Sequence, residues 1–161
     1  MEDNARKFIA ESIDQDFLKE NTATSFVLIV DWMITEEDSE KKVVCKKFEN
    51  GEIQFLLVEK VIANGNRTTN KKKISVSEYA TLLAASKAHI EKTRHEFTFV
   101  QDNVSFSVKY DQFKGEKLMM VEVDGTSETE RNAFKIEHFP YKLTEVTGDM
   151  RYYGYRITSM L

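Results

Sequence analysis

Residues 90–124, IEKTRHEFTFVQDNVSFSVKYDQFKGEKLMMVEVD, form the most informative stretch of this sequence. Three strand-like segments follow one another in this stretch, and turn signals separate them at residues 101–103 and 114–116. Because successive side chains of a strand point to opposite faces, residues i and i+2 share a face. Three charged pairs have this spacing: Lys92 with Arg94, Lys109 with Asp111, and Glu122 with Asp124.

Two interpretations of these charged pairs are open at this point. A solvated outer face is the common reason for charges in a strand. However, apolar segments lie between the charges, at residues 97–100, 104–108 and 118–123. A sheet with one apolar face and one face carrying both basic and acidic pairs suits a barrel with a charged lumen.

Length and composition bound the class of protein. The 161 residues correspond to one domain, residues 1–161. The chain has 23 Lys and Arg against 27 Asp and Glu, and this balance argues against general nucleic-acid binding through bulk positive charge. Cys45 is the only cysteine, which favours a reducing compartment. No apolar run approaches the ~20 residues of a membrane span, and the start has no signal-peptide pattern, so we expect a cytoplasmic protein.

The first half of the chain predicts mainly strands. Residues 5–12 are either a strand or the start of an amphipathic helix. Residues 25–34 are apolar and rich in β-branched and aromatic side chains, which predicts a strand buried on both faces. Residues 42–49 and 52–61 predict a hairpin with a two-residue type I′ turn at Asn50-Gly51. That turn would place Glu49 opposite Glu52, Lys46 opposite Phe55 and Lys47 opposite Gln54.

The middle and the end of the chain predict helices that flank the sheet. Residues 63–70 are expected to be a polar loop, followed by three lysines, at least one of which is interpreted as a solvated edge. Ser75 and Glu78 have the spacing of a capping box, which predicts a helix to about residue 88. Ser127 and Glu130 repeat the spacing and predict a helix over residues 126–136, anchored by Phe134. The expected fold is therefore α+β, an antiparallel barrel with helices outside it.

Several chemical motifs are absent from the sequence. There is no Gly-rich phosphate loop, no dinucleotide-binding fingerprint and no nucleophile elbow. The three histidines lack metal-ligand spacing, so a zinc site is not expected. Cys45 has no partner that would mark it as a nucleophile and is interpreted as a packed hairpin residue.

The second half of the chain resembles the CYTH superfamily, the triphosphate tunnel enzymes, which include class IV adenylate cyclases, thiamine triphosphatases and inorganic triphosphatases. The resemblance spans roughly residues 74–161. Four segments carry it in the family's order. The segment IEKTR at 90–94 is similar to the family's basic K-x-R strand, and KYDQF at 109–113 is similar to its E-x-D-x-F strand. The segment VEVD at 121–124 is similar to its a-E-v-E strand, and EVTGD at 145–149, with Arg151 and Tyr152, is similar to its E-V-T-x-D…Y segment.

The resemblance implies an antiparallel eight-stranded barrel whose lumen binds a triphosphate. It implies phosphate-binding roles for six basic residues: Lys92, Arg94, Lys7, Lys46, Lys60 and Arg151. It also implies that Asp111, Glu122 and Asp124 bind Mg²⁺ or Mn²⁺, with Glu122 and Asp124 as the catalytic residues. These roles agree with general chemistry, since Arg and Lys bind phosphate and hard cations prefer oxygen ligands.

The first half departs from the family pattern. Family members open with an E-x-E-x-K strand, and here Asp3 and Lys7 correspond to the first glutamate and the lysine, while Ala5 stands in the second glutamate position. The family's R-x-R strand keeps one basic position, at Lys46 or Lys47. Lys109 replaces a glutamate. These changes remove carboxylates and add lysines, which weakens metal binding more than anion binding.

Three functions follow from the resemblance. The first is metal-dependent hydrolysis of inorganic triphosphate, thiamine triphosphate or a nucleoside triphosphate. The second is a catalytically degenerate module that binds a nucleotide or polyphosphate. The third, ranked below both, is cyclisation of ATP. The expected partner is a triphosphate-containing small molecule, without membrane attachment, and a homodimer is one expected assembly.

Overall fold

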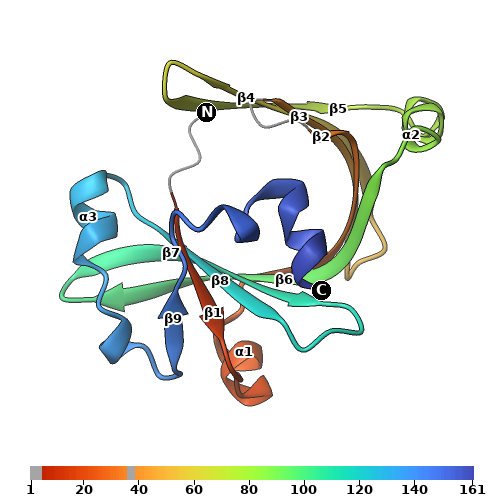
Figure 1. The fold of residues 1–161 in the computed structure, drawn as a ribbon. Coiled ribbons are helices and arrows are strands. Elements are labelled where there is room, and N and C mark those ends of the chain that lie inside the picture. The colour runs from red at the N-terminus through yellow and green to blue at the C-terminus, as the bar shows by residue number, and fades with distance from the viewer. Residues whose placement is uncertain (1–4, 36–38) are drawn as a thin grey trace. The chain divides into compact units, whose positions relative to one another are not determined.

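The computed structural model describes residues 5–35 and 39–161 (Figure 1). The described strands are β1 (Arg6–Ala10), β2 (Thr24–Thr35), β3 (Ser39–Phe48), β4 (Ile53–Ala63), β5 (Asn66–Lys73), β6 (Ala88–Gln101), β7 (Val104–Phe113), β8 (Met119–Asp124) and β9 (Leu143–Glu145). The helices are α1 (Gln15–Asn21), α2 (Val76–Leu83) and α3 (Glu128–Ala133), with short 3-10 helices η1 (Ile136–His138), η2 (Met150–Tyr152) and η3 (Gly154–Met160).

The strands form one sheet in the order β5-β4-β3-β2-β6-β7-β8-β1-β9. The pairings β1–β8, β1–β9, β2–β3, β3–β4, β4–β5 and β7–β8 are antiparallel. The predicted antiparallel α+β class is therefore confirmed, with nine strands instead of the expected eight among the described residues. The chain packs as two compact units, unit 1 (described residues 26–92 and 150–161) and unit 2 (described residues 5–25 and 93–149).

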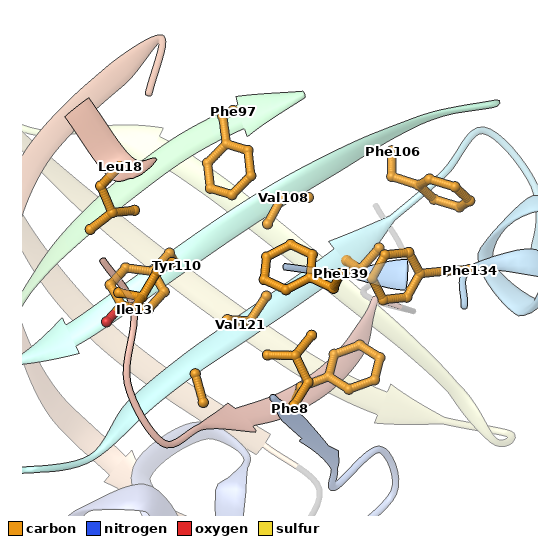
Figure 2. Packing of buried hydrophobic residues seen from close by; sticks show 13 residues of the cluster. Phe8, Ile13, Leu18, Phe97, Phe106, Val108, Tyr110, Val121, Phe134 and Phe139 are labelled. Carbon is orange, nitrogen blue, oxygen red and sulfur yellow. The ribbon is translucent and has the colours of Figure 1, made fainter. Parts of the chain in front are cut away.

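Unit 2 is built around an apolar face of its strands. Phe8 on β1, Val108 and Tyr110 on β7, and Val121 and Val123 on β8 are each 0% exposed. Their positions alternate along the strands, so they share one face of the sheet. Helical segments add Leu18, Phe134 and Phe139 to this core, as Figure 2 shows. Burial raises the pKa of Tyr110 to about 12.

Helix α3 ends immediately before Phe134, and this places the Phe134 ring in the core. The Oγ of Ser127 accepts a hydrogen bond from the backbone N–H of Glu130 at 3.2 Å, so the predicted capping box begins α3 as expected. Phe134 is the residue after the helix and is 3% exposed. Its ring lies 5.3 Å from that of Phe106 and 5.6 Å from that of Phe8. The prediction that Phe134 anchors this segment is confirmed.

The open assignment of residues 5–12 is resolved as a strand. β1 pairs with β8 on one side and β9 on the other, so its backbone groups are satisfied by the sheet. Asp14 then caps α1 by accepting from the N–H of Asp16 at 2.7 Å. Long-range pairing settled a choice that local periodicity left undecided.

In unit 1, the hairpin of β3 and β4 differs from the prediction by one residue. Lys46 pairs with Gln54 and Cys45 pairs with Phe55, so the predicted register is wrong. The loop has three residues: the N–H of Gly51 donates to the carbonyl of Phe48, and Gly51 has φ +91°. A type I turn followed by a residue in the left-handed region is the common three-residue hairpin, and it shifts the pairing relative to a two-residue turn.

The predicted polar loop at residues 63–70 is also wrong. β4 continues to Ala63, Asn64 and Gly65 form the turn with φ of 54° and 77°, and β5 follows at once. Asn-Gly is well suited to this tight turn because both residues tolerate positive φ. The polar side chains that suggested a loop belong to a strand at one end of the sheet order, where lysines are common.

Helix α2 begins at the predicted capping box. The Oγ of Ser75 accepts from the N–H of Glu78 at 3.1 Å. Tyr79 packs on Phe55 of β4 with ring centroids 4.7 Å apart. The helix ends at Leu83, earlier than the predicted residue 88, because β6 already begins at Ala88.

An ion pair links β1 to β9 in unit 2. Arg6 donates through Nε and Nη2 to the two carboxylate oxygens of Glu145, at 2.8 and 2.9 Å. Its Nη1 donates to the carbonyls of Arg131 and Phe134 at the end of α3. Hydrogen bonding from Arg6 lowers the pKa of Glu145. The guanidinium thus holds two strands and a helix end together.

This pair predicts an acid-dependent loss of stability. Because the folded pKa of Glu145 is lowered, its contribution is present above the ordinary value of 4.5 and is lost as the pH falls through the folded value. Glu145→Gln should therefore lower the unfolding midpoint in urea at pH 7, with the difference from the unmodified chain shrinking below pH 4.5. Glu20→Gln, at an exposed position of α1, is the control. A difference that stays constant down to pH 3 would contradict the assignment.

Candidate functional site

The face of unit 2 opposite the apolar core carries charged side chains. Lys7 pairs with Glu122, and Glu122 pairs with Lys109, so three adjacent strands form one row of alternating charge. The charged face consists of the following residues: Lys7, Arg94, Lys109, Asp111, Glu122 and Asp124. Lys7 is 8% exposed and Asp111 is 3% exposed. A solvated outer face does not account for burial of this degree.

Arg94 and Asp111 form the tightest ion pair of this face. Nε and Nη2 of Arg94 donate to the two carboxylate oxygens of Asp111, each at 2.7 Å. Burial disfavours the charged form of the guanidinium, but the Asp111 carboxylate outweighs it, and the pKa of Arg94 is raised. Glu122 and Glu96 act in the same direction. Arg94 is therefore held as a fixed cation among carboxylates.

Lys7 lies next to Glu122, with Nζ and Oε1 3.1 Å apart. Its backbone is fixed by the loop after β9: the N–H of Val146 donates to the carbonyl of Lys7 at 2.8 Å, and the N–H of Lys7 donates to Oγ1 of Thr147 at 2.9 Å. The EVTGD segment is therefore the support that orients the predicted phosphate-binding Lys7.

Asp124 is the most exposed carboxylate of the charged face. Its side chain is 48% exposed, and Oδ1 lies 3.4 Å from Nη1 of Arg131 on α3. The same oxygen accepts from the N–H of Gly125 at 2.8 Å. Arg131 is a basic neighbour that sequence reasoning missed. Its signal is its place in the last turn of the helix that follows β8.

The predicted metal ligands share the charged face, but each has a cationic neighbour. Asp111 pairs with Arg94, Glu122 with Lys7, and Asp124 with Arg131. Within residues 5–35 and 39–161, no group of three or more His, Cys, Asp or Glu side chains could hold a metal ion. The Mg²⁺ or Mn²⁺ site at Asp111, Glu122 and Asp124 therefore stays a prediction. Asp3, matched to the family's first glutamate, lies outside the described residues.

The other predicted phosphate-binding residues belong to unit 1. Lys46 shares a row with Leu28 and Gln54, and its Nζ lies 4.0 Å from the ring centroid of Phe26. Lys47 lies on the opposite face of β3 and is exposed, and the phosphate-binding role of Lys46 stays a prediction. Lys60 shares a row with Glu40 and Thr69 on the same face as Lys46.

Lys92 and Arg151 are the other predicted phosphate-binding residues of unit 1. Lys92 is half-buried on β6. Arg151 is exposed on η2, with its guanidinium 5.7 Å from the ring of Tyr152.

Sequence reasoning missed two lysines on the face of Lys46 and Lys60. Lys42 pairs with Trp32 and Val58, and Val58 pairs with Lys71, so Lys42 and Lys71 share one row. The Nζ of Lys42 lies 5.5 Å from the Trp32 ring. The signal was the even spacing of Lys42 and Lys46 on one strand. This face of unit 1 is therefore more basic than the sequence analysis indicated.

Cys45 is a packed residue of β3, as its interpretation from the sequence expected. Cys45 is a free, buried thiol, and burial raises its pKa, which suits a packed residue better than a nucleophile. The Nδ1 atom of His89 lies 2.9 Å from Oδ1 of Asp31.

Among the described residues, no helix has the length and apolar character needed to cross a membrane.

Comparison with known proteins defines the fold. No protein-family model and no curated protein matches the chain. The inorganic triphosphatase NE1496 is similar in structure, with a TM-score of 0.65 and 22% identity over 98% of this chain and 94% of that one. A conserved hypothetical protein from Pyrococcus furiosus matches with a TM-score of 0.53 and 12% identity over 80% of this chain and 83% of that one.

A proposed adenylate cyclase from Bacillus halodurans also matches, with a TM-score of 0.51 and 11% identity over 82% of this chain and 84% of that one. The predicted resemblance and the structural neighbours thus agree, and they do so over nearly the full length in the case of NE1496. The chain therefore has the fold of these solved structures.

Proposed function

We propose that this chain binds a triphosphate-containing small molecule and hydrolyses it with the help of Mg²⁺ or Mn²⁺. The observation that supports the proposal is the charged face of unit 2. It combines the buried Lys7 and the doubly hydrogen-bonded Arg94 with carboxylates on adjacent strands, opposite a well-packed apolar core. A triphosphate carries about four negative charges, which guanidinium and ammonium groups neutralise through charge-assisted hydrogen bonds.

Lys7 and Arg94 are the proposed phosphate ligands of this face. Arg94 presents five N–H donors, of which Asp111 uses two. Lys7 places its ammonium group beside Glu122, with Nζ donating to Oε1 at 3.1 Å. Rigid support of both residues lowers the entropic cost of gripping a flexible polyphosphate. Lys46 and Lys60 lie on unit 1, and their phosphate-binding role stays a prediction for that unit's own basic face.

Glu122 and Asp124 are the proposed metal ligands. They alternate on β8 and therefore share a face. Mg²⁺ is commonly bound by one or two carboxylates together with substrate phosphates and water, so this donor pair fits the ion. The bound ion would neutralise phosphoryl charge and lower the pKa of a water molecule.

A second candidate is a module that binds a triphosphate without turnover. The observation that favours it is the pairing of Glu122 with Lys7 and of Asp124 with Arg131, because each cation competes with a metal ion for the carboxylate. The second candidate differs from the first in one measurable property, the release of phosphate.

The test incubates the purified chain with tripolyphosphate, thiamine triphosphate or ATP, each with Mg²⁺, Mn²⁺ or a chelator. Released phosphate and cyclic AMP are measured, and binding is followed by calorimetry. We expect phosphate release from at least one substrate that depends on the metal. Tight binding without release would replace the hydrolase by the binding module. Cyclic AMP would assign a cyclase, and no binding of any triphosphate would overturn the proposal altogether.

A further inference from the structure

We propose that Asp111 is a positioning residue that orients Arg94 toward a bound phosphate, rather than a ligand of the metal ion. The inference rests on the proposed function of the charged face, because it assigns a role within that site. It assigns Asp111 differently from the family resemblance, which groups it with Glu122 and Asp124 as a metal ligand.

The geometry of the pair fixes the orientation of the Arg94 guanidinium. Both oxygens of Asp111 accept hydrogen bonds from Arg94, each at 2.7 Å, in the bidentate arrangement that fixes the plane of a guanidinium. Asp111 stands on β7, and Arg94 stands on the neighbouring strand β6. A side chain gripped at Nε and Nη2 has lost its freedom to rotate, so its other N–H groups point in set directions.

The carboxylate of Asp111 is also more deeply buried than those of the other predicted metal ligands. The side chain of Asp111 is 4% exposed, whereas those of Glu122 and Asp124 are 20% and 48% exposed. A metal ion that exchanges with solvent needs carboxylates it can reach while keeping part of its water shell. By exposure, Asp111 is the least accessible of the three predicted ligands.

The positive charge of Arg94 opposes metal binding at Asp111. A guanidinium in contact with both oxygens of Asp111 repels a divalent cation from the same carboxylate. Replacing this arrangement by a metal ion would also leave Arg94 buried without its main anionic partner, which is strongly unfavourable. The ion pair is therefore more stable than a metal complex of Asp111 in this environment.

The two assignments predict opposite effects of Asp111→Asn on tripolyphosphate binding without metal. If Asp111 positions Arg94, the loss of its charge loosens the guanidinium, and affinity for tripolyphosphate in chelator falls at least about tenfold. If Asp111 is only a metal ligand, removing a negative charge next to a polyanion leaves that affinity unchanged or raises it. The activation constant for Mg²⁺, measured on phosphate release, should change less than about threefold under the positioning role.

The experiment measures metal-free tripolyphosphate affinity by calorimetry for the unmodified chain, Asp111→Asn and Asp102→Asn. Asp102 lies in the β6–β7 turn with its side chain 73% exposed. Asp102→Asn therefore makes the same chemical change on the same hairpin at an exposed position. Arg94→Met and the double variant Arg94→Met/Asp111→Asn complete a cycle. Because Asp111 acts through Arg94, we expect Asp111→Asn to have no further effect when Arg94 is absent.

Each outcome has one meaning. Weaker metal-free binding in Asp111→Asn that disappears in the Arg94→Met background supports the positioning role. Unchanged or tighter binding, or a large rise in the Mg²⁺ constant alone, overturns it. If circular dichroism shows that Asp111→Asn is unfolded, Asp111→Glu is compared in the same way. That variant keeps the charge and displaces it by one methylene. Failure of the unmodified chain to bind tripolyphosphate would instead overturn the proposed function.

Discussion

Glu122→Gln is expected to reduce metal-dependent phosphate release on the order of 100-fold. Glutamine keeps the size of the side chain and an oxygen acceptor for Lys7, but it removes the negative charge proposed to hold the metal ion. A neutral amide is a poorer ligand for a hard divalent cation than a carboxylate. The measurement is phosphate release from tripolyphosphate at saturating substrate, over a range of Mg²⁺ concentrations.

The control for this variant is Glu116→Gln, which makes the same change in the exposed turn between β7 and β8. It should leave the rate unchanged. Thermal unfolding of both variants separates loss of activity from loss of the fold. If Glu122→Gln is folded and releases phosphate at the rate of the unmodified chain, Glu122 is not part of the metal site.

Phe134→Ala is expected to lower the free energy of unfolding by about 3–5 kcal/mol, the range for removal of a buried phenyl ring. Phe134 is 3% exposed and packs against the rings of Phe8, Phe106 and Phe139 (Figure 2). Truncation removes all three contacts at once and leaves a cavity that neighbouring rigid rings cannot fill. Urea unfolding followed by circular dichroism measures the change.

Val100→Ala is the matched control, since Val100 lies on β6 with 60% exposure. Its effect should stay within about 0.5 kcal/mol. Phe134→Leu, which keeps most of the buried volume, should lie between the two. An unfolding free energy for Phe134→Ala equal to that of the control would show that this core does not depend on the anchor of α3.

The regularity of the second half made its strands predictable. Residues 90–124 alternate apolar and charged side chains in three segments, and β6, β7 and β8 form there as expected. Capping boxes at Ser75 and Ser127 begin α2 and α3 because the bonds involved are local. The prediction of a loop at residues 63–70 was wrong for the opposite reason. A polar strand at one end of the sheet order needs no apolar pattern, so pairing with its neighbour β4 determined its conformation.

The register of the first hairpin shows a further limit. Asn50-Gly51 indicated a turn correctly, but one residue more or less in the loop changes every cross-strand pair. The observed three-residue loop places Lys46 beside Gln54 and Cys45 beside Phe55. Turn length depends on how both strands pair further along, which the local sequence does not encode.

The order of residues along each strand establishes which charged side chains stand at alternating positions, and therefore which of them could share a face. The partners of these side chains depend on the folded sheet. Asp111 and Glu122 look equivalent in the sequence, yet Asp111 is buried against Arg94 and Glu122 lies beside Lys7 with more exposure. Side-chain partners depend on strand order and on the depth of burial, which arise from contacts between residues far apart in the chain. That difference underlies the separate roles proposed for the two carboxylates.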